Sequence, residues 1–221
     1  MAEPSAIPYA GQKWHIVEIK SLGKVTLPVV NVNSRLHIAS FVIIDNYELV
    51  RKLARIVGKE MSRYNPRYLM CIEAKSLPLT YAICDYLNTL YTRRKAGINV
   101  RYIVVRKTKK IYMKSPYSVR VKSITTKTKQ RLFVDRNDLT KLRANNFILL
   151  DDVISTGATV NAILSLLRKR GLNPSAIFSV LFEGGMEADK IDYSDKSRVH
   201  VFGRIPLYVK RHRLFWKEKP K

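Results

Sequence analysis

The sequence contains few cysteines and few histidines, and each shortage excludes a class of protein. Its 221 residues include only Cys71 and Cys84, which cannot form the disulfide framework of a small secreted domain. They are too far apart for a Cys-x-x-Cys redox or metal motif, and the four histidines stand singly along the chain. We therefore expect two buried, reduced thiols and no metal bound directly by a cluster of protein ligands.

Long apolar runs and two glycine-rich motifs are also absent. No stretch approaches 18 consecutive apolar residues, and the N-terminus lacks the basic and apolar segments of a secretory signal. We therefore expect a soluble, cytoplasmic protein with no membrane partner. The missing Gly-x-x-x-x-Gly-Lys and Gly-x-Gly-x-x-Gly patterns exclude a Walker-type nucleotide triphosphatase and a Rossmann-type dehydrogenase.

Acidic residues are scarce relative to basic ones. The chain has 17 Asp and Glu against 41 Lys and Arg, which gives a formal net charge of +24. Such a charge fits a nucleic-acid-binding surface, but the favoured interpretation is a solvated, lysine-rich surface of the kind found in thermophiles. Charge alone leaves both interpretations open. With 46% hydrophobic residues the chain can bury the core of one ordinary domain.

Amphipathic segments alternate with short apolar, β-rich runs, which is typical of an α/β domain with a mostly parallel sheet. Apolar residues at helical spacing predict helices at 47–61, directly after residue 76, and at about 159–170. Core strands are predicted at 68–72, 100–105, 146–150, 176–182 and 199–202. Residues 119–124 and 130–134 predict a hairpin that leaves the sheet as a mobile flap.

The most informative segment is residues 147–159, where an apolar strand is expected to end at Asp151 and Asp152 before a Ser/Thr/Gly loop opens a helix. Backbone N–H groups at a helix N-terminus, together with neighbouring hydroxyls, bind phosphate. The two carboxylates suit sugar hydroxyls, either directly or through Mg²⁺. The segment therefore predicts a ribose phosphate site; the alternative is a simple helix cap.

This segment resembles the phosphoribosyl diphosphate (PRPP) motif of type I phosphoribosyltransferases. Two other segments support the resemblance. The pyrophosphate-binding turn of adenine and archaeal hypoxanthine enzymes is similar to Ile72-Glu-Ala-Lys-Ser-Leu-Pro78, and their Arg-Lys segment is similar to Val105-Arg-Lys-Thr-Lys-Lys110. The three segments occur in the order found in the family, so the resemblance covers about residues 36–206.

The resemblance implies a type I phosphoribosyltransferase fold, in which helices flank a mostly parallel central sheet beside a small hood and a mobile flap. It divides the chain into a hood at 1–35, a core at 36–206 with its flap at about 107–131, and a basic aromatic tail at 207–221. The implied reaction is attack of a purine nitrogen on C1 of PRPP. The implied partners are PRPP, Mg²⁺, the purine base, AMP, pyrophosphate and a second copy of the chain in a homodimer.

The resemblance also implies a role for each candidate site residue. Asp151 and Asp152 would lie under the ribose and hold Mg²⁺, with Arg106 and Lys107 as further catalytic residues. Pyrophosphate would be bound by Glu73, Ala74, Lys75, Ser76, Arg106, Lys107 and Lys110, and the 5′-phosphate by Ser155, Thr156, Gly157, Ala158 and Thr159. Glu73 has two open roles, as a helix cap or as the group that orients Lys75. Base contacts are expected from Val153, Ile154, Phe202, Ile205 and Tyr208, of which the last three also fit ordinary strand packing.

The sequence departs from the family at two positions that concern the base. The flap of adenine enzymes carries a glutamate, whereas Ser123, Thr125 and Thr126 occupy this stretch without an acid. Ser155 stands where human-type 6-oxopurine enzymes have an aspartate, which favours adenine as the base. The alternatives are a 6-oxopurine enzyme, or a PRPP-sensing regulator that binds nucleic acid through its positive charge and its tail at 210–221.

Overall fold

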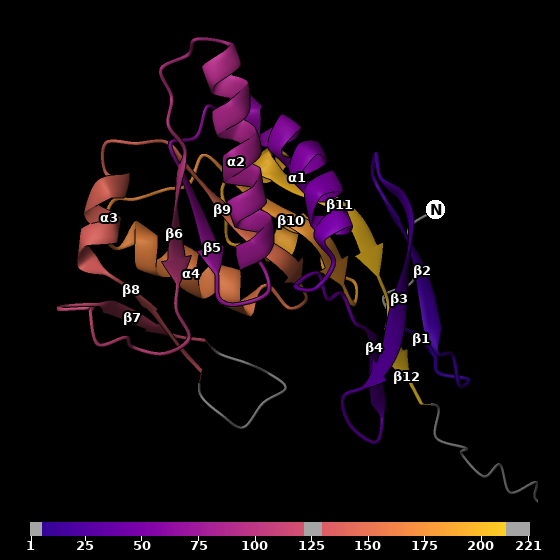
Figure 1. Cartoon of the computed structure of the whole chain (residues 1–221). Helices are drawn as coiled ribbons and strands as arrows, with labels where there is room; N and C mark the ends of the chain where they lie inside the picture. Colours follow the sequence, from indigo (N-terminus) through magenta and orange to yellow (C-terminus); the bar gives the residue numbers. More distant parts are fainter. Residues whose placement is uncertain (1–5, 122–129, 211–221) are drawn as a thin grey trace, which may run out of the picture.

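The computed structural model describes residues 6–121 and 130–210 (Figure 1). Its central feature is a parallel five-stranded sheet in the order β11-β10-β9-β5-β6. The five strands are β5 (Tyr68–Ile72), β6 (Arg101–Val105), β9 (Phe147–Ile154), β10 (Ala176–Glu183) and β11 (Val199–Ile205). The predicted α/β class with a mostly parallel sheet is confirmed.

Helices cover both faces of this core sheet, because side chains along each strand alternate between the two faces. In β5, Leu69 packs in one hydrophobic cluster with α1 (Tyr47–Met61) and α2 (Leu77–Arg93). The next residue, Met70, packs in a second cluster with α3 (Arg136–Leu142) and α4 (Ala158–Arg168). Short 3-10 turns η1 (Ser62–Tyr64), η2 (Ala188–Lys190) and η3 (Lys196–Arg198) complete the helical elements that the structure describes.

Helix α1 has the predicted bounds. The Asn46 side chain caps it by accepting a hydrogen bond from the Leu49 N–H at 3.0 Å. Glu48 in the first turn and Lys59 in the last turn complement the helix dipole. A continuous apolar stripe on α1 faces the sheet, so capping and burial both favour the helix.

Strand β9 is longer than predicted. It continues past Leu150 to Ile154, because β10 pairs with it in the registers Asp151↔Ser179 and Val153↔Leu181. The expectation that the strand ends at the two carboxylates is therefore wrong. Asp151 and Asp152 lie within β9, and the loop begins only at Ser155.

A second five-stranded sheet forms the hood, in the order β1-β12-β4-β3-β2. Its strands are β1 (Ala6–Pro8), β2 (Trp14–Ile19), β3 (Gly23–Asn31), β4 (Leu36–Ala39) and β12 (Leu207–Val209). Strand β12 lies between β1 and β4, so both ends of the described chain meet in the hood (Figure 1). Residues 36–39 and 207–209, which the sequence placed in the core and in the tail, therefore belong to the hood sheet.

The predicted hairpin is present as β7 (Tyr117–Arg120) and β8 (Arg131–Val134). It is joined to the core by two backbone hydrogen bonds between Arg106 and Phe133, of 2.9 and 2.8 Å. The tip at 122–129, which includes Ser123, Thr125 and Thr126, lies outside the described residues, as does the tail at 211–221.

The two cysteines are unpaired and buried, as predicted. Burial raises the pKa of Cys71 to about 11 and that of Cys84 to about 12. Within residues 6–121 and 130–210, no helix has the length and apolar character needed to cross a bilayer.

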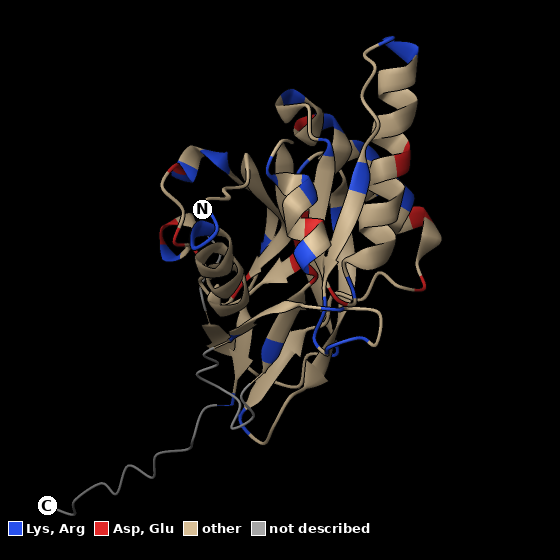
Figure 2. Cartoon of the chain, turned by 90° about the vertical axis from the view of Figure 1, so that its left-hand side faces the viewer, with Lys and Arg blue, Asp and Glu red and all other residues tan. Residues whose placement is uncertain are grey.

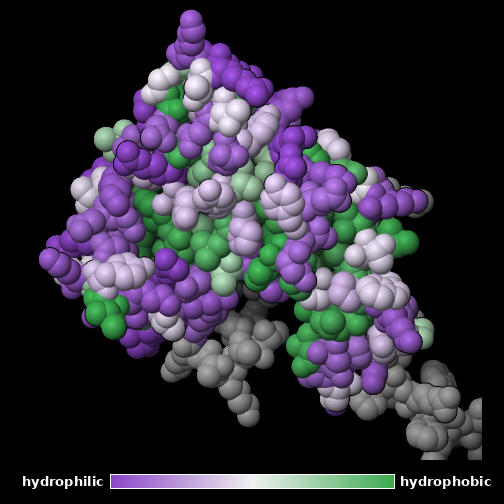
Figure 3. All heavy atoms as spheres, in the orientation of Figure 1, coloured by the Kyte–Doolittle hydropathy of each residue, from purple (hydrophilic) through white to green (hydrophobic). Residues whose placement is uncertain are grey.

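The basic residues do not gather on one element: Lys and Arg are distributed over many helices, strands and loops (Figure 2). On the face seen in Figure 3, hydrophobic side chains are exposed at the centre and on the hood, and hydrophilic side chains surround them.

Candidate functional site

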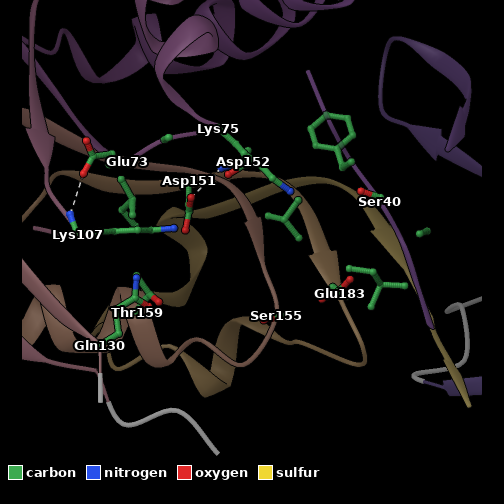
Figure 4. A pocket seen from close by; sticks show the side chains of 16 residues that line it. Ser40, Glu73, Lys75, Lys107, Gln130, Asp151, Asp152, Ser155, Thr159 and Glu183 are labelled. Carbon is green, nitrogen blue, oxygen red and sulfur yellow. Dashed lines mark hydrogen bonds between the residues drawn. The ribbon is translucent and has the colours of Figure 1, made fainter. Parts of the chain in front are cut away.

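A pocket of about 300 Å³ opens at the carboxyl ends of the core strands, beneath the hood (Figure 4). Parallel α/β sheets bind their ligands at this end of the strands. The pocket collects residues from six separate parts of the chain. It is lined by Ile38, Ala39, Ser40, Phe41, Ile72, Glu73, Ala74, Lys75, Lys107, Gln130, Asp151, Asp152, Val153, Ser155, Thr159 and Glu183.

The loop after β9 forms a smaller hollow of about 50 Å³ beside this pocket. All five predicted phosphate-loop residues, 155–159, line it. Gly157 adopts a φ of 72°, in the left-handed region that glycine tolerates best, and the helix begins at the next residue. Backbone N–H groups in the first turn of a helix have no partner within the helix and are available to an anion. The loop has the geometry of a phosphate site.

Asp151 and Asp152 lie side by side in the pocket. The backbone N–H of Asp152 donates to Oδ1 of Asp151 at 3.0 Å, and Asp152 is 8% exposed. Burial, followed by the neighbouring Asp152 carboxylate, raises the pKa of Asp151 well above its usual range. The two carboxylates disfavour each other's negative charge, so a bound cation or hydroxyl donors from a ligand would stabilise the pair.

Glu73 has neither of the two roles expected from the sequence. Its carboxylate accepts hydrogen bonds from Arg106 Nη1 at 3.1 Å and from the Lys107 backbone N–H at 2.9 Å, and Lys110 Nζ lies 3.6 Å from it. Burial by itself would raise the pKa of Glu73, but these donors and cations outweigh it and lower the pKa. Glu73 therefore fixes the segment after β6 against the end of β5, and it neither caps α2 nor contacts Lys75.

The turn between β5 and α2 presents Ala74 and Lys75 to the pocket. The peptide bond between Glu73 and Ala74 is cis. The Lys75 side chain extends past Asp152 into the pocket (Figure 4). Ser76 is fully buried and its hydroxyl donates to the Ile72 carbonyl, so it closes the turn and does not line the pocket.

The three cations predicted after β6 have different positions. Lys107 lines the pocket and its side chain points toward Asp151 (Figure 4). Arg106 and Lys110 are instead held at Glu73 and do not line the pocket. Their role at the pyrophosphate stays a prediction; in this structure the carboxylate of Glu73, which itself lines the pocket, holds both side chains.

Two of the five predicted base contacts lie at the site. Val153 lines the main pocket, and Ile154 is buried beneath the phosphate-loop hollow. Phe202, Ile205 and Tyr208 do not line the pocket, and this expectation is corrected.

The physical reason is that these three side chains are needed in the core. Each is at most 6% exposed. The ring of Phe202 lies 6.4 Å from that of Phe178, and the Tyr208 ring packs edge-on against Tyr9 and His15. They join the hood to the core sheet rather than face a ligand.

Three parts of the pocket were not predicted from the sequence: the wall formed by the hood, Gln130, and Glu183. The hood contributes residues 38–41, at and just after the end of β4. Glu183 is the last residue of β10. The signal that identified Asp151, an acidic residue after an apolar β-rich run, would also have identified Glu183. Burial raises the pKa of Glu183, and the charge of Lys75 partly opposes this.

The site suits a divalent cation only with help from a substrate. The described residues contain no group of three or more His, Cys, Asp and Glu placed to hold a metal ion. Mg²⁺ typically binds through one or two carboxylates, substrate phosphates and water. The pair Asp151 and Asp152 fits that mode, and these two residues would hold Mg²⁺ together with a bound diphosphate.

Comparison with known proteins assigns the family. The phosphoribosyl transferase domain matches residues 43–205. The chain is 30% identical over 173 residues to the hypoxanthine/guanine phosphoribosyltransferase of Methanotorris igneus, covering 78% of this chain and 83% of that protein. It is 21% identical over 150 residues to the purine biosynthesis transcriptional repressor of Bacillus subtilis, covering 68% of this chain and 48% of the repressor.

Solved structures show the same fold. The adenine phosphoribosyltransferase of Saccharomyces cerevisiae, in a complex that contains adenine, superimposes with a TM-score of 0.59 at 15% identity, covering 86% of this chain and 93% of that one. The family domain matches most of the chain, and the acidic pair and the β5–α2 turn line one pocket beside the phosphate-loop hollow; the chain belongs to the phosphoribosyltransferase family.

Proposed function

We propose that this chain is a purine phosphoribosyltransferase of nucleotide salvage that transfers the 5-phosphoribosyl group of PRPP to adenine, giving AMP and pyrophosphate. The observation that carries the proposal is the shared pocket: Asp151, Asp152, Lys75 and Lys107 line it, and Ser155 and Thr159 join it to the adjacent phosphate-loop hollow. An anion site, a diol site and a cationic site in this order match the three parts of PRPP.

In this proposal the ligand follows the order of the strands. The 5′-phosphate binds the loop after β9, the ribose lies over Asp151 and Asp152, and the pyrophosphate faces the β5–α2 turn and Lys107. Bound Mg²⁺ would neutralise part of the charge on the pyrophosphate. As the C1–O bond breaks, the ribose gains positive charge beside the two carboxylates and the leaving group gains negative charge beside the lysines. Both changes lower the energy of the transition state more than that of bound PRPP.

Adenine is proposed as the base for two reasons. The Glu73-Ala-Lys-Ser turn is similar to that of adenine enzymes, and Ser155 replaces the aspartate of human-type 6-oxopurine enzymes. A second candidate is a 6-oxopurine such as hypoxanthine or guanine, which is favoured by the 30% identity to an archaeal hypoxanthine/guanine enzyme.

A cytoplasmic homodimer is part of the same proposal. Its support is a set of exposed apolar side chains on α2, on the edge strand β6 and on the segment after it, where a second copy would exclude water from them. These are Tyr81, Tyr102, Ile111 and Tyr112, which are 65, 44, 105 and 63% exposed. Sedimentation at the mass of a single chain over the micromolar range would contradict the dimer.

The experiment that tests the function is a panel of bases. Purified protein is incubated with PRPP and Mg²⁺ and, separately, with adenine, hypoxanthine, guanine, xanthine, uracil or orotate, and any monophosphate is resolved by chromatography. Conversion of adenine alone is the expected result. A preference for a 6-oxopurine would support the proposed reaction but contradict adenine as the base. If the folded protein forms no product from any base, the enzymatic function is contradicted and the alternative of a PRPP-sensing regulator is favoured.

A further inference from the structure

We propose that Glu183 determines the choice of base, by accepting a hydrogen bond from the 6-amino group of adenine. The inference rests on the proposed function, because it assumes that a purine ribose phosphate occupies the pocket. It concerns a residue that the mechanism above does not use.

The position of Glu183 follows from the strand order. Strands β6, β5, β9 and β10 are consecutive neighbours in the sheet, and each strand or the segment directly after it contributes to the pocket. Lys107 and Lys75 follow the carboxyl ends of β6 and β5, Asp151 lies in the carboxyl-terminal half of β9, and Glu183 ends β10. If the pyrophosphate lies over β6 and β5 and the ribose over β9, the base is directed toward β10 and the hood. Glu183 is the acidic residue at that end of the pocket.

The surroundings of Glu183 favour a ligand rather than a structural role. The wall opposite is formed by residues 38–41 of the hood, with the apolar side chains of Ile38 and Phe41, and Val153 lies on the neighbouring strand. Apolar walls with one polar group are typical of sites that hold and orient a flat ring. The charged groups around Glu183 are Lys75 from the β5–α2 turn and the Asp151–Asp152 pair from β9, while Ser40 is the polar residue on the hood side.

The two glutamates of the pocket differ in their partners. Glu73 is bound to Arg106 and to the Lys107 backbone. The part of the chain that the structure describes supplies no hydrogen bond or ion pair to the carboxylate of Glu183, although burial disfavours its charge. Glu183 is half-buried and lines the pocket, so its carboxylate oxygens are available to accept a hydrogen bond from a bound ligand.

The 6-amino group of adenine is a donor of the required kind, and the 6-oxo group of hypoxanthine is an acceptor that a carboxylate repels. A hydrogen bond to a charged group contributes about 1.5–3 kcal/mol, which corresponds to about 10- to 150-fold in affinity. Glu183 therefore has the chemistry to select adenine over an otherwise similar base.

The test is a double-mutant cycle in which one change is made in the protein and the other in the ligand. The protein change is Glu183→Met, which keeps the length of the side chain and removes the acceptor. The ligand change is from AMP to purine riboside 5′-monophosphate, which lacks only the 6-amino group. Dissociation constants are measured by calorimetry on the full chain, with ribose 5-phosphate as a ligand without a base and Glu48→Met as the matched exposed control.

Three results are expected. Wild type binds AMP at least tenfold more tightly than purine riboside 5′-monophosphate, Glu183→Met binds the two equally, and Glu183→Gln, which retains a carbonyl acceptor, gives an intermediate ratio. Ribose 5-phosphate binds wild type and both variants within twofold, which shows that the pocket is intact, and Glu48→Met behaves as wild type.

An AMP preference that is the same in wild type and Glu183→Met would overturn the inference, as would equal losses of affinity for AMP and ribose 5-phosphate, or no binding of AMP to wild type. Turnover of adenine, measured on the same preparations, tests the proposed function separately. Turnover without coupling in the cycle refutes only the role of Glu183, and coupling without turnover refutes only the enzymatic function.

Discussion

The contact that fixes the segment after β6 gives a stability prediction that can be worked out from the structure. Glu73→Gln keeps the shape of the side chain and removes its charge. The two hydrogen bonds go to different oxygens, from Arg106 Nη1 to Oε1 and from the Lys107 N–H to Oε2, and a glutamine has only one carbonyl oxygen, so one bond is lost and the other is weakened. The attraction of Lys110 at 3.6 Å is lost as well.

The magnitude follows from the type and exposure of these contacts. A hydrogen bond to a charged group contributes about 1.5–3 kcal/mol and a neutral one about 0.5–1.5 kcal/mol, so losing one bond and weakening the other costs about 2.5–4.5 kcal/mol before screening. Arg106 and Lys110 are 27 and 36% exposed, and solvent reduces the expected loss to about 1–2 kcal/mol. For a chain of 221 residues this lowers Tm by about 2–8 °C.

The assay is thermal unfolding followed by circular dichroism, repeated at several pH values. Because the folded-state pKa of Glu73 is lowered, its contribution is present above the unfolded pKa of about 4.3 and is lost as the pH falls through the folded value. The difference between wild type and Glu73→Gln should thus be full at pH 7 and disappear in strong acid. Glu18→Gln, at an exposed residue of β2, should change Tm by less than about 2 °C. Equal Tm values at pH 7, or a difference that does not change with pH, would refute the reasoning.

Two further predictions concern the core. Gly203→Ala should destabilise the fold by about 1–3 kcal/mol, because a Cβ at this position would lie 2.8 Å from a β2 carbonyl oxygen and 2.8 Å from the Leu181 side chain. If the variant unfolds in urea at the same midpoint as wild type, this close approach of hood and core is contradicted. Cys71 and Cys84, with pKa values raised by burial to about 11 and about 12, should react with iodoacetamide at pH 7.5 only after unfolding; rapid labelling of the native protein would contradict their burial.

The parts of the site that could be predicted from the sequence are those in which neighbouring residues act together. The phosphate loop is continuous in the sequence, and an apolar run followed by acids, hydroxyls and Gly157 specifies a strand, a turn and a helix start locally. The β5–α2 turn and the bounds of α1 were predictable for the same reason, since capping and helical periodicity are local properties.

Contacts that depend on the order of strands could not be predicted in this way. Glu73 and Lys107 are 34 residues apart and meet only because β5 and β6 pair in parallel. Phe202 and Tyr208 have the composition of ring-stacking residues, but the N-terminal strands of the hood pack against them and remove them from the pocket. The extension of β9 past Leu150 likewise follows from its pairing with β10, which lies later in the chain.

The central claim is that this pocket transfers the phosphoribosyl group to a purine, and the most direct measurement is base-dependent release of pyrophosphate from PRPP. It is made with wild type, with Asp152→Asn and with Asp189→Asn, which changes an exposed aspartate outside the pocket. Wild type and Asp189→Asn should release one pyrophosphate for each AMP formed, and Asp152→Asn should fall below one-tenth of that rate with an unchanged melting curve. Folded wild-type protein that releases no pyrophosphate with any purine, or an Asp152→Asn variant that retains more than one-tenth of the rate, would contradict the account.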